Sequence, residues 1–167
     1  MSTEWRRKIS GQGRGLTTLV EFGLMIQGKK SEGIVEIEDL TIKGAKGGGL
    51  YASNGMKVIM RGCTIEECGE EGVYATEADI TCDDLQVIGC GYSGVCAYNN
   101  ATITLSGHGT SIQGNGTKGD SNYYGLKAYY SSSFNHLVPP LTKQQISKEN
   151  GGGGNWGGDG TIKQIPK

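Results

Sequence analysis

The residues best suited to acid–base chemistry are two adjacent carboxyl groups and a histidine further along the chain. Asp83 and Asp84 are neighbours, and His108 lies between two glycines. One carboxyl group acting as general acid and a second acting as general base can hydrolyse a glycosidic bond when a water molecule fits between them. These residues can do so only if the fold brings them into one open groove. Otherwise, His108 is a polar residue in a short insertion.

Tyrosines offer binding chemistry instead. Tyr51 and Tyr74 occupy equivalent positions in two similar segments, and aromatic faces stack on sugar rings or anchor protein interfaces. Ordinary packing between neighbouring strands is the alternative for these two residues. Segment 114–124 is rich in Gly, Asn, Asp and Tyr, and loops on repeat scaffolds often carry recognition. Its last residues are predicted contacts, namely Asn122, Tyr123 and Tyr124.

Charge and composition narrow the classes of partner. The 16 basic and 17 acidic residues give a net charge of -1, so we expect no binding to nucleic acid or to an anionic membrane. No apolar stretch is long enough for a membrane span. The first residues lack the apolar core of a secretory signal, which favours an intracellular or assembly-bound protein. The basic residues near the start are typical of a frayed polar terminus, with contact to an acidic neighbour as the alternative.

The five cysteines do not form a metal-binding pattern. None belongs to a Cys-x-x-Cys pair with a histidine nearby. We therefore expect reduced cysteines that pack as small apolar residues, and neither a metal site nor a cofactor. Eight acidic residues between Glu66 and Asp84 could hold calcium, but a solvated face is the simpler interpretation.

A repeat organises the middle of the chain. A Gly-apolar-x-Ala segment recurs at residues 49–52, 72–75, 94–97 and 125–128, with spacings of 23, 22 and 31 residues. Two further segments with alternating apolar residues recur in the same register. Segments this short, joined by connections too short for a helix, predict three parallel strands in each coil of a solenoid.

Inward residues of successive coils then form columns that define the register. We predict four columns: Val35/Val58/Ile80/Ile103, Ile37/Met60/Cys82/Leu105, Ile42/Ile65/Val87/Ile112 and Leu50/Val73/Val95/Leu126. An outward column of Glu38, Arg61 and Asp83 alternates in charge. In another column Lys43 lies beside Glu66. A slip of one residue would bury these charges and expose the aliphatic residues.

Glycine, with 30 of 167 residues, is in large excess and is expected at the corners of the coils. We predict sharp turns with a positive φ just before each Gly-apolar-x-Ala strand, at Gly47 to Gly49, Gly69, Gly72, Gly91, Gly94 and Gly125.

Three regions follow from the repeat. Residues 1–33 form an N-terminal arm and an irregular first coil or cap. Residues 34–133 form regular coils with an insertion at 114–124, and residues 134–167 form looser coils that end in a glycine-rich cap. In the last region, residues 145–147 align with the Thr-Ile strand of earlier coils, and Asn150 aligns with Asn115.

The coil repeat resembles that of right-handed parallel β-helix proteins, the pectin-lyase-like fold. Residues 131–133, 141–143, 146–147, 150–154 and 160–162 are similar to uncharacterised β-helix proteins of algae and their large DNA viruses. Repeat and resemblance predict an all-β, single-stranded right-handed parallel β-helix, a solenoid of roughly 5–7 coils with about 22–23 residues each. Because this scaffold serves hydrolases, lyases, adhesins and non-catalytic binding proteins, it indicates a fold rather than a function.

One local match implies catalysis. Asp83-Asp84, followed one coil later by Gly107-His108-Gly109, resembles the motifs of polygalacturonase-like hydrolases. That resemblance gives Asp83, Asp84 and His108 catalytic roles. Two motifs of those enzymes are missing, however. Gly62-Cys63-Thr64 stands in place of an Asn-Thr-Asp, and no Arg-Ile-Lys follows.

The sequence therefore favours a non-catalytic β-helix that acts as a binding module or as a structural subunit of a larger viral or algal assembly. We expect a protein partner or self-association through a face or the ends of the solenoid, since solenoid ends expose unpaired strand edges. A polysaccharide bound by the tyrosines is a second option. A carbohydrate-active hydrolase of the polygalacturonase type is the alternative function.

Overall fold

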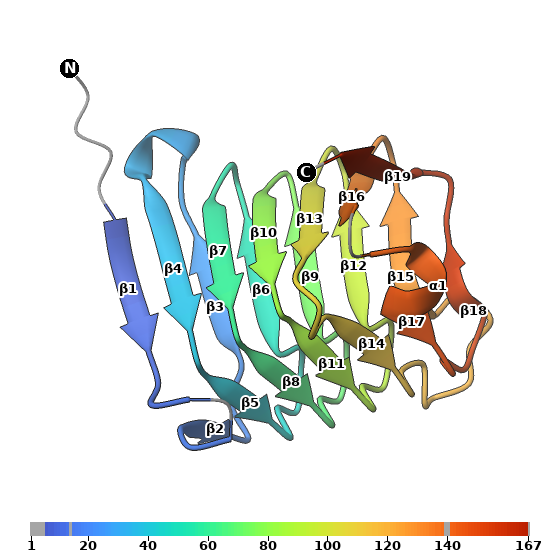
Figure 1. Ribbon diagram of the computed structural model, residues 1–167, viewed down its shortest axis with the longest axis horizontal. Coiled ribbons are helices and arrows are strands. Elements are labelled where there is room, and N and C mark those ends of the chain that lie inside the picture. Colours follow the sequence, from blue (N-terminus) through green and yellow to red (C-terminus); the bar gives the residue numbers. More distant parts are fainter. Residues whose placement is uncertain (1–5, 14, 139–140, 167) are drawn as a thin grey trace.

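The computed structural model describes residues 6–13, 15–138 and 141–166. In this part of the chain short strands follow one another around a coil, and the coils stack into three parallel sheets (Figure 1). The predicted all-β parallel β-helix is confirmed. The strands form six coils, and one further strand begins a seventh.

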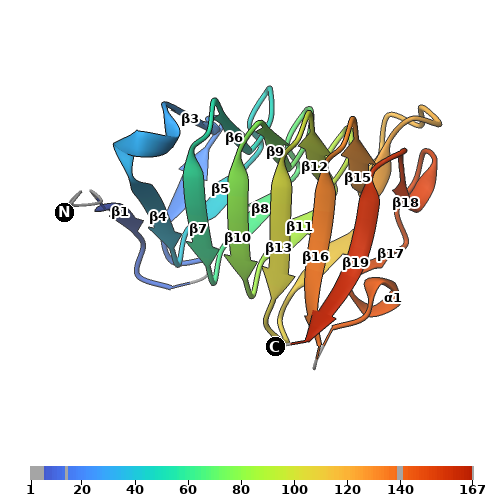
Figure 2. The ribbon, with the colours of Figure 1, turned by 90° about the horizontal axis from the view of Figure 1, so that it is seen from above.

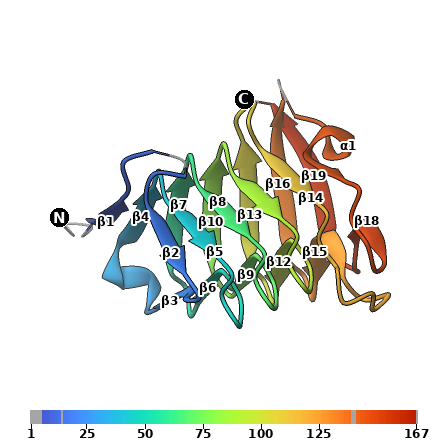
Figure 3. The ribbon, with the colours of Figure 1, turned by 90° about the horizontal axis from the view of Figure 1, so that it is seen from below.

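Each sheet takes one strand from every coil. Sheet A, the row in front in Figure 2, consists of β1 (Arg6–Ser10), β4 (Ile34–Glu38), β7 (Lys57–Arg61), β10 (Asp79–Asp83), β13 (Thr102–Ser106), β16 (Ser133–Val138) and β19 (Thr161–Pro166). Sheet B, which crosses the view from below in Figure 3, consists of β2 (Thr18–Val20), β5 (Thr41–Lys43), β8 (Thr64–Glu66), β11 (Gln86–Ile88), β14 (Ser111–Gln113) and β17 (Ser147–Lys148). Sheet C consists of β3 (Leu24–Gln27), β6 (Leu50–Ser53), β9 (Val73–Thr76), β12 (Val95–Tyr98), β15 (Tyr124–Tyr129) and β18 (Gly154–Gly157).

Two short helical turns complete the described elements, the 3-10 helix η1 (Lys30–Glu32) and the helix α1 (Lys143–Ile146). Helix α1 lies at the C-terminal end of the stack (Figure 1). Ile146 at its end and Leu141 before it are buried. No helix in the described ranges has the length and apolar character needed to cross a membrane.

The core confirms the four predicted inward columns. Val58, for example, pairs with Val35 in the coil before it and with Ile80 in the coil after it. The other columns have the predicted partners in sheets A, B and C. All sixteen side chains are buried. Burial of apolar side chains on every coil is the main stabilising term, because each short strand could not persist alone.

Outward charges also follow the predicted register. Nζ of Lys43 lies 2.9 Å from Oε1 of Glu66, and Nη1 of Arg61 lies 2.9 Å from Oε1 of Glu38. The third member of the predicted charged column behaves differently, since Asp83 accepts a hydrogen bond from the Ser106 hydroxyl group at 2.9 Å. Exposed ion pairs of this kind contribute little stability but oppose a slip in register.

The interpretation of the first basic residues as a frayed terminus is wrong for the part that the structure describes. Residues 6–10 form strand β1, which pairs in parallel with β4. Arg6 lies 2.9 Å from Glu36, and Lys8 lies 2.6 Å from Glu38. The alternative, contact with an acidic neighbour, is correct, and that neighbour is the next coil. Strands β2 and β3 complete this first coil, where the sequence predicted an irregular one.

Most of the glycines before the sheet C strands are required for space and not for a positive φ. None of the glycines predicted there has a positive φ. A Cβ at Gly72 would instead lie 2.2 Å from Cγ1 of Val87, and one at Gly94 would lie 2.5 Å from Cγ2 of Ile112. A left-handed conformation occurs instead at the start of the same connection, directly after sheet B, at Glu21, Gly44, Glu67, Gly89, Gly114 and Glu149.

The last coil departs from the predicted alignment by one residue. Ser147, not Ile146, pairs with Ile112. Ile146 is instead the last residue of helix α1, and its side chain is buried at the end of the core. The Thr142 side chain caps this helix by accepting a hydrogen bond from the backbone amide of Gln145. Asn150 does align with Asn115 as predicted, because Oδ1 of Asn150 accepts hydrogen bonds from both nitrogen atoms of Asn115 at 3.0 Å.

We expect Ile103→Ala to destabilise the protein by about 2–5 kcal/mol, because Ile103 is fully buried in the first column. Urea denaturation of both proteins measures the difference. The matched control is Thr104→Ala, the next residue of β13 on the outward face, which should cost less than about 1 kcal/mol. Equal losses from the two substitutions would contradict the predicted inward and outward assignment.

Candidate functional site

The outer face of sheet C carries a row of tyrosines. In strands β6 and β9, Leu50 and Val73 point into the core, so the residues that follow them point outward. Those residues, Tyr51 and Tyr74, are paired in register. Their ring centroids lie 5.4 Å apart, and their planes differ by only 10°. Tyr98 extends the row with its ring centroid 6.2 Å from that of Tyr74.

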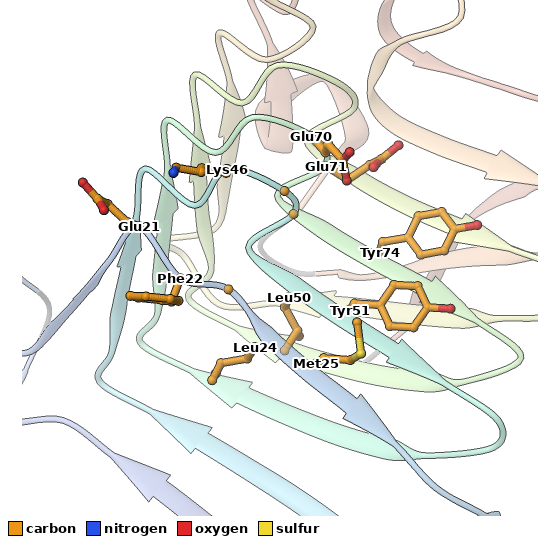
Figure 4. Close-up of a pocket in the computed structure, with 13 residues that line it drawn as sticks. Glu21, Phe22, Leu24, Met25, Lys46, Leu50, Tyr51, Glu70, Glu71 and Tyr74 are labelled. Carbon is orange, nitrogen blue, oxygen red and sulfur yellow. The ribbon is translucent and has the colours of Figure 1, made fainter.

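Tyr51 and Tyr74 line a groove at the N-terminal part of the stack (Figure 4). Its volume is about 610 Å³, and its walls come from three corners and from the strands β3, β6 and β9. Phe22 and Met25 of the first coil form its apolar end, and both are more than two-thirds exposed. The remaining charged and apolar lining residues are Glu21, Leu24, Lys46, Leu50, Glu70 and Glu71.

The groove is rich in carboxylate groups. In Figure 4, Glu70 and Glu71 lie on the Tyr74 side, whereas Glu21 and Lys46 lie on the side of Phe22. Burial raises the pKa of the Glu71 carboxyl group, and the neighbouring Glu70 adds to this, although Lys127 and Lys118 oppose it. Burial likewise raises the pKa of Tyr74. The ionised form of Glu71 is therefore disfavoured in the folded protein unless a positive charge comes near it.

A second aromatic cluster lies one coil beyond Glu70, whose carbonyl group accepts a hydrogen bond from the Tyr92 backbone amide, and it holds the 114–124 insertion in place. The rings of Tyr92 and Tyr123 stack with centroids 4.4 Å apart. Nζ of Lys118 lies 4.5 Å above the Tyr92 ring, and Nζ of Lys127 lies 5.9 Å from the Tyr123 ring. Cation–π contacts on both sides of a stacked pair stabilise this arrangement. The insertion thus folds back onto the solenoid.

The structure separates the five predicted binding residues. Tyr51 and Tyr74 come together in the groove, which the other three do not line. Tyr123 stacks on Tyr92, and the Tyr124 ring packs directly against the backbone of the C-terminal glycines. Asn122 is exposed, and its backbone amide donates a hydrogen bond to Oδ1 of Asp120 at 2.8 Å. Tyr51 and Tyr74 are therefore the best-placed members of the predicted set.

The three predicted catalytic residues lie at a different corner, where sheet A meets sheet B. Oδ1 of Asp84 accepts a hydrogen bond from the Gly109 amide at 2.7 Å, which closes the loop that carries His108. His108 itself is exposed, and Asp83 is bonded to Ser106. Within the described residues this corner is not part of the groove. The Asp84 carboxylate thus supports the loop that carries His108.

Several groove residues were not predicted as a site. Glu70, Glu71 and Lys46 belong to corners, which the sequence marked only by glycine and by a run of acidic residues. The repeated position of these corners before each sheet C strand was the available signal, because stacked corners must lie side by side. The acidic run does not gather into a metal site, since no group of three or more His, Cys, Asp or Glu within the described ranges is placed to hold an ion.

The cysteines are buried and free in the structure. Cys96 lies in the outward column between Tyr74 and Lys127. Burial raises its pKa to about 12, so its thiol stays protonated and unreactive at neutral pH. It fills the row beyond Tyr74 as a small apolar residue.

Comparison with known proteins gives one match. A family model described as "Right handed beta helix region" matches residues 22–154, which is most of the chain. No curated protein and no solved structure matches the chain.

We expect Glu71→Gln to stabilise the protein at neutral and alkaline pH. Because the folded state raises the pKa of Glu71 above its ordinary value of 4.5, the wild-type protein loses stability as the pH rises through the raised pKa. The glutamine side chain of the variant does not ionise, so the variant does not lose stability in this way. Its urea midpoint should therefore exceed that of the wild type at about pH 8 and coincide with it at about pH 4.

Asp79→Asn provides the control for this experiment, because Asp79 is an exposed carboxylate on sheet A. This substitution removes an exposed negative charge rather than a buried one, so it should not reproduce the gain in stability at about pH 8. A difference between Glu71→Gln and wild type that is the same at both pH values would contradict the role of burial.

Proposed function

The chain belongs to the right-handed β-helix family, and on that scaffold we propose a non-catalytic binding module that holds a carbohydrate chain along the outer face of sheet C. The observation that carries this proposal is the nearly parallel pair of Tyr51 and Tyr74 in an open groove of about 610 Å³. Aromatic side chains bury large apolar areas while their polar ends remain wet, which suits a sugar ring with its apolar faces and polar rim.

Rigidity supports the same function. Tyr51 and Tyr74 project from paired strands whose inward neighbours are fully buried, so little side-chain entropy remains to be lost on binding. The row of outward residues also runs along the solenoid axis from Met25 through Tyr51 and Tyr74 to Cys96. An extended chain can contact several coils at once in this direction, which a compact ligand could not do.

The hydrolase alternative has less support in the structure. General acid–base hydrolysis needs two carboxyl groups facing one open site. The carboxylates of Asp83 and Asp84 are instead engaged by Ser106 and by the Gly109 amide at a corner outside the groove. Binding without catalysis needs only the surface that the tyrosines supply.

Self-association is a second candidate role, because the first coil exposes large apolar side chains. Leu16 and Phe22 are each 74% exposed and Val20 is 56% exposed. Contiguous exposed apolar groups are typical of protein interfaces. If this surface joins two copies, light scattering at increasing concentration should give a mass above 17.7 kDa, and Phe22→Asp should return the mass to that of a single chain. A wild-type mass of 17.7 kDa at all concentrations would exclude this role.

We expect Tyr74→Ala to weaken carbohydrate binding by about tenfold or more, which corresponds to about 1.4 kcal/mol. Isothermal titration with hexasaccharides of glucose, galacturonate, N-acetylglucosamine and glucosamine provides the measurement. At least one of them should bind the wild type. Ile59→Ala, an outward apolar residue of sheet A, is the control and should leave the affinity unchanged. The proposal fails if the wild type binds none of the four, or if both variants bind equally well.

A further inference from the structure

The groove carries a one-sided charge. Three carboxylates, Glu21, Glu70 and Glu71, line it together with a single cationic side chain, that of Lys46. They come from the corners before β3, β9 and β6, which are far apart in sequence and are brought together by the stacking of coils. The lysine lies at the Phe22 side, so the region beside Tyr74 holds two carboxylates (Figure 4).

Neighbouring cations do not neutralise this pair. In the described part of the chain, neither Glu70 nor Glu71 takes part in an ion pair, although acidic residues on and beside sheets A and B do. The two lysines whose charge reaches Glu71 are held elsewhere: Lys118 lies over the Tyr92 ring, and Lys127 lies over the rings of Tyr123 and Tyr129. A positive group from a ligand would therefore supply the missing counter-charge.

The aromatic wall favours the same kind of group. The Tyr74 ring is stacked between the rings of Tyr51 and Tyr98, so a ligand meets its edge and its hydroxyl group, whose oxygen can accept a hydrogen bond from an ammonium group. Tyr74 is half-buried beside Glu71, and the charge of Glu71 is one cause of its raised pKa. The edge of the tyrosine row with its hydroxyl groups and a partly buried carboxylate thus point to one ligand feature, a hydrogen-bond-donating cation attached to a partly apolar body.

We propose that the groove selects a glycan with free amino groups, namely a chain of amino sugars such as glucosamine. This inference rests on the proposed carbohydrate-binding function. The sugar ring lies against Tyr51 and Tyr74, and the ammonium group lies between Tyr74 and the carboxylates of Glu70 and Glu71. An acetylated amino sugar keeps the ring but loses the positive charge, so it makes only the first of these contacts.

The test compares two hexasaccharides, one of glucosamine and one of N-acetylglucosamine, by isothermal titration at about pH 6 and low salt. We expect the wild type to bind the glucosamine chain at least about fivefold more tightly. Glu70→Gln/Glu71→Gln should lose this preference while it keeps the affinity for the acetylated chain. Asp79→Asn, which removes one charge from sheet A, should keep the preference, and thermal melting confirms that the variants are folded.

Each outcome separates the inference from the function on which it rests. Equal binding of both chains by the wild type overturns the preference for amino groups and leaves carbohydrate binding intact. Absence of binding to every saccharide tested overturns the proposed function itself. A hexalysine peptide is the third probe: if it binds as tightly as the glucosamine chain, charge alone is recognised and the assignment to a glycan is wrong.

Discussion

Parallel pairing of each coil with the next, residue over equivalent residue, is the constraint on which the whole structure depends. Coils about 4.8 Å apart place every side chain directly above its counterpart. The buried column of Val58, the ion pair between Lys43 and Glu66, and the ring pair of Tyr51 and Tyr74 all arise from this one pairing. A shift of one residue would destroy all three together, since inward and outward positions would exchange.

The same constraint explains why the fold could be predicted in such detail. Where a strand alternates strictly and its repeat length is constant, the partner of each residue follows by counting, as with Ile65 and Val87. The irregular ends were predicted less well. The pairing of β1 depends on Glu36 and Glu38 in the next coil, and the one-residue shift at Ser147 depends on helix α1. Neither is set by the repeat.

Corners limited the prediction of the site. The sequence placed Tyr51 and Tyr74 on strands, where direction follows from alternation, and so their meeting could be predicted. Glu71 and Lys46 lie on corners, where backbone direction depends on contacts such as that of Gly72 with Val87. Glycine is needed at these corners because a side chain would clash with its neighbours, not because φ is positive. A lack of space and a positive φ both select glycine in the sequence, so only the structure distinguishes the two causes.

A solenoid acquires a specific site where an outward column changes its chemistry. Along sheet C the column passes from Met25 through Tyr51 and Tyr74 to Cys96 and Lys127. The core columns beneath hardly change, so the scaffold tolerates this variation at little cost in stability. The groove runs from the apolar first coil at one end to Glu70, Glu71 and Tyr74 at the other. Because the repeat fixes spacing but not side-chain identity outside the core, recognition depends on the few outward and corner residues that break the pattern.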